Sequence, residues 1–364
     1  MHRDALSWAC EIGEALLVIP RPLGLPGSLM NGEAGIALFL AHLGHTMGDA
    51  RFLEGAESLL ADATEFAGEL GPFLHNGFTG AAWTLEHLAG PVLAPSEDDP
   101  NEDCDGAVAE VLAEGCRGHW DLMFGAAGLG NYAIERGNLF AEALASLEAG
   151  AEERAGGLTW WHEGEGIYFL GMSHGVAGIM AFLAELHGRA PALRPRIERL
   201  LEGAHRFLAA QRLPGGGFPR LAGDTASLPL GWCHGDLGIA VALLRAGRAV
   251  GESRWIDEAL TLARACAGRR DTAGKDAGFC HGTAGIAHLF RRLQQASGDQ
   301  VLGEAAEFWL GETLRHRRAD GLVLRREKAT WLPDPALLGG AAGVGLVLLD
   351  LAPGWDRIFL TDLV

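Results

Sequence analysis

The chain has 364 residues, of which 48% are hydrophobic and 21% are charged, a composition typical of a soluble globular protein with a large core. Acidic residues outnumber basic residues by 47 to 29, which gives a formal net charge of −18. This excess of negative charge argues against nucleic acid or an anionic membrane surface as the main partner.

The N-terminal segment, residues 1–26, does not have the pattern expected of a secretory signal, because Asp4, Glu11 and Glu14 interrupt its apolar run. No uninterrupted apolar run approaches the length of a transmembrane helix. We therefore expect a cytoplasmic protein with no transmembrane segment. Six cysteines do not make a disulfide scaffold in a chain of this length, and in a reducing compartment thiols more often bind metals or take part in catalysis.

A glycine pair with the spacing Gly-x-x-Gly recurs along the whole chain, and an apolar pattern of helical period follows it. After the second glycine the apolar positions fall at i, i+3, i+4 and i+7, as in Ile36, Phe39, Leu40 and Leu43. Seven pairs that precede such an apolar pattern, at fairly even spacing, indicate a repeated structural unit that begins a helix each time. The pairs are Gly32/Gly35, Gly77/Gly80, Gly125/Gly128, Gly175/Gly178, Gly235/Gly238, Gly282/Gly285 and Gly340/Gly343.

A second set of helical patterns alternates with the glycine-started helices. Examples are Arg51 to Glu69, Asp105 to Cys116, Leu193 to Gln211, Arg254 to Ala267 and Leu302 to Leu314. This alternation predicts an all-α fold, an α/α toroid of seven inner and about seven outer helices in a single domain over residues 1–364. The alternative is an open helical solenoid. Closure is favoured because the first and last units, at Gly32 and Gly340, are as apolar as the middle ones, whereas the caps of a solenoid should be polar.

Three longer connections interrupt the alternation, at Pro91 to Asp103, Gly156 to Gly171 and Leu213 to Gly231. Taken together they are rich in glycine and proline, which indicates loops or short hairpins. We expect them to lie over the functional site.

The residues just before the first glycine of each pair should gather at one end of the ring, because every inner helix begins there. Polar chemistry is concentrated in the fourth, fifth and sixth units, which contribute Ser173-His174, Cys233-His234 and Cys280-His281. The N-termini of the inner helices point to the same end, where their dipoles favour thiolates and developing negative charge.

Cys233, Cys280 and His281 offer thiolate and imidazole ligands that suit zinc. Three protein ligands and an open position are the pattern of a catalytic zinc, whereas His234 as a fourth ligand would make the site structural. The alternative is that both cysteines are small buried hydrophobic residues beside two histidines at helix starts. The other cysteines are expected to be ordinary free thiols: Cys10, Cys104, Cys116 and Cys266.

At these residues the chain resembles the lanthionine synthetase C-like (LanC) family. The resemblance covers nearly the whole chain and rests on W-C-H-G-x-x-G at Trp232, C-H-G-x-x-G at Cys280, S-H-G-x-x-G at Ser173 and W-D-x-x-x-G-x-x-G at Trp120. It implies an α/α toroid with one Zn²⁺ bound by the residues matching Cys233, Cys280 and His281. Similar proteins add a cysteine thiol to dehydroalanine or dehydrobutyrine in a peptide, while relatives in animals add glutathione to dehydrated residues.

The resemblance also implies that His174 is the catalytic histidine and that Asp121 is the aspartate ahead of its own glycine pair. The competing interpretations are a helix-capping histidine and a helix N-cap aspartate. His234, at a position where a tyrosine is common, is the second candidate for the acid–base role. Pro229 stands where bacterial cyclases often carry an arginine, for which Arg220 is a candidate substitute. Three other histidines are interpreted as surface or structural, with a place at the mouth of the site as the alternative: His75, His119 and His162.

The expected function is therefore that of a zinc-dependent lanthipeptide cyclase. In the reaction a substrate thiol adds to a dehydrated residue, and a histidine transfers the proton. The expected substrate is a dehydrated precursor peptide supplied by a separate dehydratase. Two alternatives remain, namely addition of glutathione or another small thiol, and a non-catalytic, zinc-stabilised scaffold that binds peptides.

Overall fold

The computed structural model of the chain describes residues 2–20, 24–95, 98–162, 167–328, 330–349 and 354–363. Across these residues the regular structure is almost all helical, as predicted, with two small antiparallel hairpins. The helices in this part of the chain are too short or too polar to cross a lipid bilayer.

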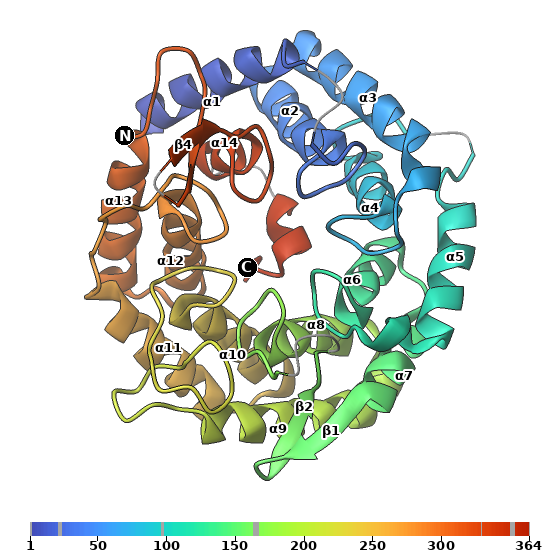
Figure 1. Cartoon of the computed structure of the whole chain (residues 1–364), viewed down its shortest axis with the longest axis vertical. Coiled ribbons are helices and arrows are strands. Elements are labelled where there is room, and N and C mark those ends of the chain that lie inside the picture. Colours follow the sequence, from blue (N-terminus) through green and yellow to red (C-terminus); the bar gives the residue numbers. More distant parts are fainter. Residues whose placement is uncertain are drawn as a thin grey trace. The chain divides into compact units, whose positions relative to one another are not determined.

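Each of the seven glycine pairs named above lies at the start of a helix, which confirms the predicted inner set; the helices are labelled in Figure 1. The first glycine of a pair is the residue before the helix; Gly175 and Gly235, for example, have extended backbone there. Most of these helices are buried on nearly all sides. The set consists of α2 (Glu33–Met47), α4 (Phe78–Leu88), α6 (Ala126–Arg136), α8 (Val176–Arg189), α10 (Asp236–Val250), α12 (Thr283–Ser297) and α14 (Ala341–Leu349).

The outer helices alternate with the inner ones and are amphipathic. In α9, for example, Ile197, Leu200, Leu201 and Phe207 are buried on one face, which follows the helical period. The predicted members are confirmed as α3 (Ala50–Glu65), α5 (Glu102–Ala113), α9 (Arg194–Ala210), α11 (Ser253–Ala267) and α13 (Gln300–Leu314). Two further outer helices were not predicted individually, α1 (His2–Leu17) and α7 (Phe140–Gly150).

The predicted connections consist of irregular loops and part of one hairpin. One hairpin, β1 (Ala151–Arg154) and β2 (Gly157–Trp160), extends into the connection that begins at Gly156. Residues 213–231 form a loop that is joined to the preceding connection by a bridge between Phe169 and Leu221. The hairpin of β3 (Leu324–Glu327) and β4 (Thr330–Pro333) was not predicted. Residues 96–97 and 163–166 of the predicted connections lie outside the described part of the chain.

The chain folds into two compact units, each assembled from segments that are separate in sequence. The first consists of Met1–Cys104, Asp271–His288 and Glu304–Arg357, and the second of Asp105–Arg270, Leu289–Gly303 and Ile358–Val364. Cys280 and His281 belong to the first unit, whereas the other predicted site residues belong to the second. A single domain over residues 1–364 stays a prediction.

Within each unit, successive repeats are joined by a backbone hydrogen bond at the same position, two residues before the first glycine. The amide of one repeat donates to the carbonyl of the next. The bonds join Met30 to His75 at 2.8 Å, Ser173 to Cys233 at 3.1 Å and Cys280 to Leu338 at 2.9 Å. The predicted ligand positions Cys233 and Cys280 are therefore held by the same contact that sets the register between repeats.

The second residue of a pair must be glycine where the loop before the helix passes close to it. A Cβ atom on Gly238 would lie 2.2 Å from the carbonyl oxygen of Trp232, and one on Gly178 would lie 2.0 Å from that of Met172. Both distances are far shorter than a van der Waals contact. Any side chain here would push the loop away from the helix, and with it the residue that precedes the first glycine.

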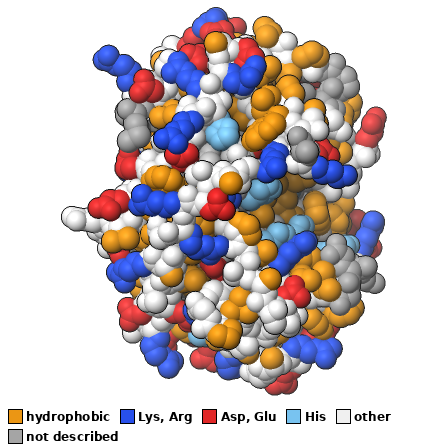
Figure 2. Space-filling view, turned by 60° about the vertical axis from the view of Figure 1, so that its left-hand side comes forward, with side chains coloured by type: hydrophobic (Ala, Val, Ile, Leu, Met, Phe, Trp, Pro, Cys, Tyr) orange, Lys and Arg blue, Asp and Glu red, His pale blue; other side chains and the backbone are white. Residues whose placement is uncertain are grey.

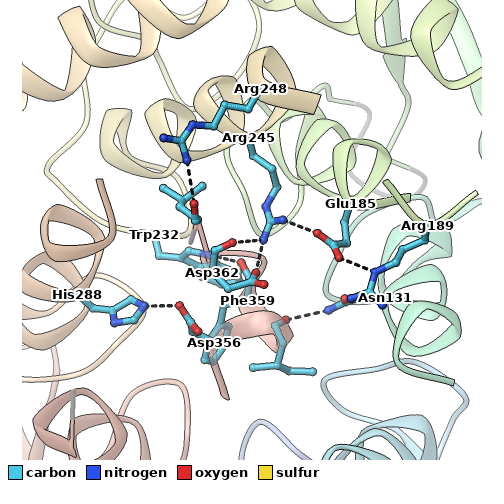
Figure 3. A network of polar contacts seen from close by, with 12 residues as sticks. Asn131, Glu185, Arg189, Trp232, Arg245, Arg248, His288, Asp356, Phe359 and Asp362 are labelled. Atoms are coloured by element: carbon cyan, nitrogen blue, oxygen red, sulfur yellow. Dashed lines mark hydrogen bonds and ion pairs between the residues drawn. The ribbon is translucent and has the colours of Figure 1, made fainter. Parts of the chain in front are cut away.

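The C-terminal segment of the second unit is bound to the helices that carry the candidate site (Figure 3). Arg245 of α10, whose side chain is only 9% exposed, pairs with Glu185 of α8 at 2.6 Å and with Asp362. The indole N–H of Trp232 donates to the carbonyl oxygen of Phe359 at 3.1 Å. Because Trp232 directly precedes Cys233, this segment fixes the loop that presents a predicted metal ligand.

The interior of the first unit contains buried histidines that pack within the core. Burial, followed by the neighbouring His87 and His45, lowers the pKa of His42 to about 3, so this side chain is neutral at physiological pH. His288 pairs with the fully buried Asp356 at 3.0 Å (Figure 3).

The surface is mixed in charge over the face drawn in Figure 2, where basic and acidic side chains are interspersed. The described residues of this face therefore offer no extended basic surface of the kind that tracks a nucleic-acid backbone.

Candidate active site

Asp121 organises the candidate site in the second unit. It lies in the turn before α6, where its Oδ1 accepts the backbone N–H groups of Met123 at 2.8 Å and Phe124 at 2.7 Å. The residue before the helix is Gly125, so the interpretation of Asp121 as the helix N-cap is wrong. The carboxylate instead braces the turn with one oxygen and leaves the other oxygen for side chains.

The second oxygen of Asp121 is shared by two histidines. Its Oδ2 lies 3.1 Å from Nδ1 of His174 and 3.2 Å from Nε2 of His162. Burial raises the pKa of Asp121, but several contacts outweigh this effect and hold that pKa well below its usual range. These contacts are the hydrogen bonds from His162 and His174, the charge of His174 and the hydrogen bond from the amide of Phe124. Asp121 is therefore an ionised carboxylate inside the protein.

An ionised oxygen accepts hydrogen bonds, so it selects the tautomer of each histidine. His174 donates through Nδ1, which makes its Nε2 the basic nitrogen, and 23% of its side chain is exposed. His174 lies directly before Gly175, and Gly175, not His174, is the N-cap residue of α8. Its hydrogen bond to Asp121 favours the acid–base interpretation over the capping interpretation.

His162 was interpreted from the sequence as surface or structural, and in the structure it contacts Asp121 at 3.2 Å. It follows β2 in an irregular connection, where its backbone N–H donates to Ile167 at 3.2 Å. No motif surrounds it, so the sequence carried no signal for its role.

Phe169 is a second residue that the sequence did not indicate. It is 4% exposed, and its ring lies 5.3 Å from that of His162, 5.7 Å from that of His174 and 5.6 Å from that of His234. His234 in turn stacks on His174 at 5.8 Å with an angle of 28° between the rings. The two histidines considered for proton transfer thus lie side by side on an apolar support.

The loop at residues 213–231 adds a cation to this cluster. The guanidinium of Arg220 lies over the ring of Phe169 at 5.2 Å, and the Arg220 carbonyl accepts from Leu170 at 3.1 Å. The loop is anchored by Asp236 at the start of α10, which accepts from the Phe218 amide at 2.7 Å and pairs with Arg269 at 2.7 Å.

The predicted metal ligands stand at equivalent places in the two units. In the first unit, the ligand atoms of Cys280 and His281 lie within 4.8 Å of each other, just before α12. Cys280 is half-buried and His281 is exposed. In the second unit, the half-buried Cys233 occupies the same position before α10. Thiol and imidazole donors at such positions fit the ligand chemistry of zinc.

Two of the remaining cysteines are poor candidates for metal binding or catalysis. Burial raises the pKa of Cys116 to about 11, against a weaker opposing effect of its hydrogen bond with Ser146. Burial, with a contribution from Asp236, raises the pKa of Cys266 to about 12. Both are protonated thiols at neutral pH, in agreement with the prediction that they are ordinary free thiols.

The arrangement of helices defines the class of fold. The structure is similar to that of nisin cyclase, with a TM-score of 0.76 and 16% identity, covering 99% of this chain and 97% of that one. This likeness identifies the fold as an α/α toroid. An inactive variant of an α-1,6-mannanase from Salegentibacter sp. HEL1_6, in complex with α-1,6-mannotriose, aligns with a TM-score of 0.50 and 13% identity, covering 98% of this chain and 99% of that one.

The chain belongs to the lanthionine synthetase C-like protein family, whose model matches residues 25–360. Among characterised relatives it is similar to the glutathione S-transferase LANCL1 of Danio rerio, with 28% identity over 103 residues. That match covers 28% of this chain and 24% of the relative, about a quarter of its length.

Proposed function

We propose that this protein is a zinc-dependent lanthipeptide cyclase. It would add cysteine thiols of a dehydrated precursor peptide to dehydroalanine or dehydrobutyrine, giving lanthionine or methyllanthionine rings. The observation that carries the proposal is the pairing of His174 with the ionised, buried Asp121 at 3.1 Å, beside His234, in a chain of the LanC-like family. The dehydrated residues imply a separate enzyme that removes water from serine or threonine.

Cys233, Cys280 and His281 would hold the zinc ion. Their side chains supply two sulfurs and one imidazole nitrogen, and three protein ligands leave one position for a substrate sulfur. Each of the three residues stands just before an inner helix, where the backbone dipole favours a thiolate. Zinc, when bound, would lower the pKa of the substrate thiol and fix the position of its sulfur.

His174 would carry the proton through the reaction. Its Nε2 accepts the proton of the substrate thiol, and Asp121 stabilises the imidazolium that forms. As the C–S bond forms, the C=C π bond breaks and its electrons move onto the neighbouring carbonyl. The imidazolium then returns its proton to Cα, so atoms and charges balance and the histidine is regenerated.

His234 is the second candidate for this role. Its ring lies parallel to that of His174 within 30°, so both histidines border the same space. The contact of His174 with Asp121 at 3.1 Å fixes the tautomer of His174. We therefore assign proton transfer to His174 and a supporting position to His234.

Binding geometry would contribute more to the rate than thiol activation. A free thiol of pKa about 8.5 is a few per cent ionised at neutral pH, so complete ionisation gains at most about 30-fold. Holding sulfur and alkene in contact can contribute up to roughly 7–11 kcal/mol. The apolar support around Phe169 and the anchored loop at residues 213–231 would supply this positioning.

A second candidate function is the addition of glutathione or another small thiol to dehydrated residues. The similarity to the glutathione S-transferase LANCL1 favours it. The same residues would perform the same chemistry, and only the source of the thiol would differ. A dehydrated peptide that contains cysteine is incubated with the enzyme and excess glutathione, and the free thiols that remain are then alkylated before mass spectrometry. A cyclase gives the unchanged mass with no alkylated cysteine, and the alternative gives the glutathione adduct with an alkylated cysteine.

Two variants test the proposed chemistry. Cys280→Ala should lose both zinc and activity, while His174→Ala should keep zinc and lose about 10²–10⁴-fold in kcat. Cys10→Ala is the matched control for removing a thiol. If Cys280→Ala cyclised the peptide without metal, the zinc mechanism would be wrong. If the wild-type protein bound dehydrated peptide without converting it, the non-catalytic scaffold would be the correct function.

A further inference from the structure

We propose that Asp121, His162 and His174 form a second divalent-metal site, separate from the zinc site proposed at Cys233, Cys280 and His281. An ion at this second site would inhibit the enzyme by occupying the acid–base histidine. The binding part of this inference is independent of the proposed function, whereas the inhibition rests on it.

The three ligand atoms already have the spacing of a metal site. Oδ2 of Asp121 lies 3.1 Å from Nδ1 of His174 and 3.2 Å from Nε2 of His162, and all three atoms lie within 4.8 Å of one another. Ligands at about 2.0–2.1 Å from a tetrahedral ion are separated from each other by roughly 3.3 Å. The two oxygen–nitrogen distances already match this separation, whereas the two nitrogens, within 4.8 Å of each other, would approach to about 3.3 Å when zinc or a similar ion binds.

The donor set is also one that divalent transition metals prefer. Two imidazole nitrogens and one carboxylate oxygen leave further positions open, as in catalytic zinc sites and non-haem iron sites. The carboxylate is ionised, and its other oxygen is fixed by the amides of Met123 and Phe124. This anchoring orients Oδ2 before any ion arrives.

Access and ring orientation are compatible with binding. The side chain of Asp121 is 2% exposed, but those of His162 and His174 are 15% and 23% exposed, so an ion can enter from their side. The two imidazole rings are nearly perpendicular, at 86°, and approach the same oxygen from different directions.

Metal binding would change the tautomer of His174. An ion on Nδ1 requires the proton there to move to Nε2, which is the nitrogen that accepts the thiol proton in the proposed reaction. A neutral histidine makes this change without net loss of a proton. The ion thus removes the base and the interaction with Asp121 in one step, and inhibition should follow its occupancy.

Cobalt(II) titration tests the site without relying on activity. In wild-type protein the first equivalent should give a thiolate-to-cobalt charge-transfer band, and the second should add visible d–d absorption with no further charge transfer. The Cys280→Ala variant should still show the d–d absorption of the ion bound at Asp121, His162 and His174. His162→Gln, which retains an N–H donor to Asp121 at the same place but is a poor ligand, should weaken the binding of this ion at least about tenfold.

His119→Gln is the matched control, because His119 lies beside His162, with ring centroids 5.8 Å apart, but outside the group of three ligands. It should bind the second ion as the wild type does. A single cobalt equivalent in the wild type, or equal weakening by His119→Gln and His162→Gln, would overturn the second site, whatever the enzyme's activity proves to be.

The inhibition is measured by adding zinc beyond one equivalent to the zinc-loaded enzyme during cyclisation. The rate should fall with a midpoint equal to the dissociation constant of the second site. In His162→Gln the midpoint should move at least about tenfold higher. Second-site binding with no loss of rate would refute the inhibition and leave the metal site standing.

Discussion

Asp121→Asn is the substitution that most sharply separates catalysis from stability in the second unit. The new side chain has nearly the same shape, and its carbonyl oxygen can still accept from the amides of Met123 and Phe124. The other position, however, becomes an NH₂ group, which donates where Oδ2 accepted. His174 must then present Nδ1 as an acceptor and carry its proton on Nε2.

The expected loss of activity follows from the two hydrogen bonds that Oδ2 of Asp121 accepts, from His174 at 3.1 Å and from His162 at 3.2 Å. Hydrogen bonds to a charged group contribute about 1.5–3 kcal/mol each. A catalytic histidine held in the wrong tautomer loses about 10³–10⁴-fold in kcat, which corresponds to roughly 4–5.5 kcal/mol of activation free energy. We expect this loss in Asp121→Asn with zinc content unchanged.

The assay is single-turnover cyclisation of a dehydrated peptide, in which the free thiols that remain are alkylated before mass spectrometry because ring formation leaves the mass unchanged. Zinc is measured by atomic emission. Asp105→Asn is the control, because Asp105 pairs with Arg136 at 2.7 Å in the same unit and takes no part in the proposed site. A kcat for Asp121→Asn within about threefold of the wild type, at full zinc content, would refute the assignment of His174 as the base.

Arg245→Met should lower the free energy of unfolding by about 3 kcal/mol in urea denaturation, because the side chain is 9% exposed and its ion pairs with Glu185 and Asp362 are lost. Arg189→Met, which removes the pairing of a 44% exposed side chain with Glu185, should change the free energy of unfolding by less than about 1 kcal/mol. Gly238→Ala should destabilise by at least about 2 kcal/mol, since its Cβ would lie 2.2 Å from a backbone oxygen. Gly188→Ala, in a helix with open space around it, should instead stabilise by roughly 0.5–1 kcal/mol; equal effects of the two alanines would contradict the packing argument. The pKa of Asp121 is lower in the folded protein than in the unfolded chain, so its ionised form stabilises the fold. This stabilisation is complete above the unfolded pKa of about 3.9 and is lost as the pH falls toward the folded value. The free energy of unfolding of Asp121→Asn should therefore fall less steeply below pH 4 than that of the wild type.

The repeat could be predicted from the sequence because its physical cause is local. The carbonyl oxygen that excludes a Cβ from Gly238 belongs to Trp232, which is close in the chain. The requirement for glycine is therefore visible as a short sequence motif. The same reason made the inner helices and most outer helices predictable. α7 lacks such a marker, and it begins after Leu139, which has a positive φ of 53°.

The parts of the site that could not be predicted come from irregular segments or from distant parts of the chain. His162 and Phe169 lie in a connection without periodicity, and only the fold brings them to Asp121 and His174. The pairing of Arg245 with Asp362 likewise joins residues that no local pattern relates. The sharing of one zinc ion by Cys233, Cys280 and His281 stays a prediction from the repeat and the family resemblance.

X-ray absorption at the zinc edge of the purified protein, loaded with one equivalent of zinc, tests that ligand set most directly. The proposed function predicts two sulfur ligands at about 2.3 Å, one imidazole nitrogen at about 2.0–2.1 Å and one exchangeable oxygen, with a third sulfur when a substrate thiol is added. A spectrum with fewer than two protein sulfurs, or with a fourth protein ligand that persists when the thiol is added, would contradict it.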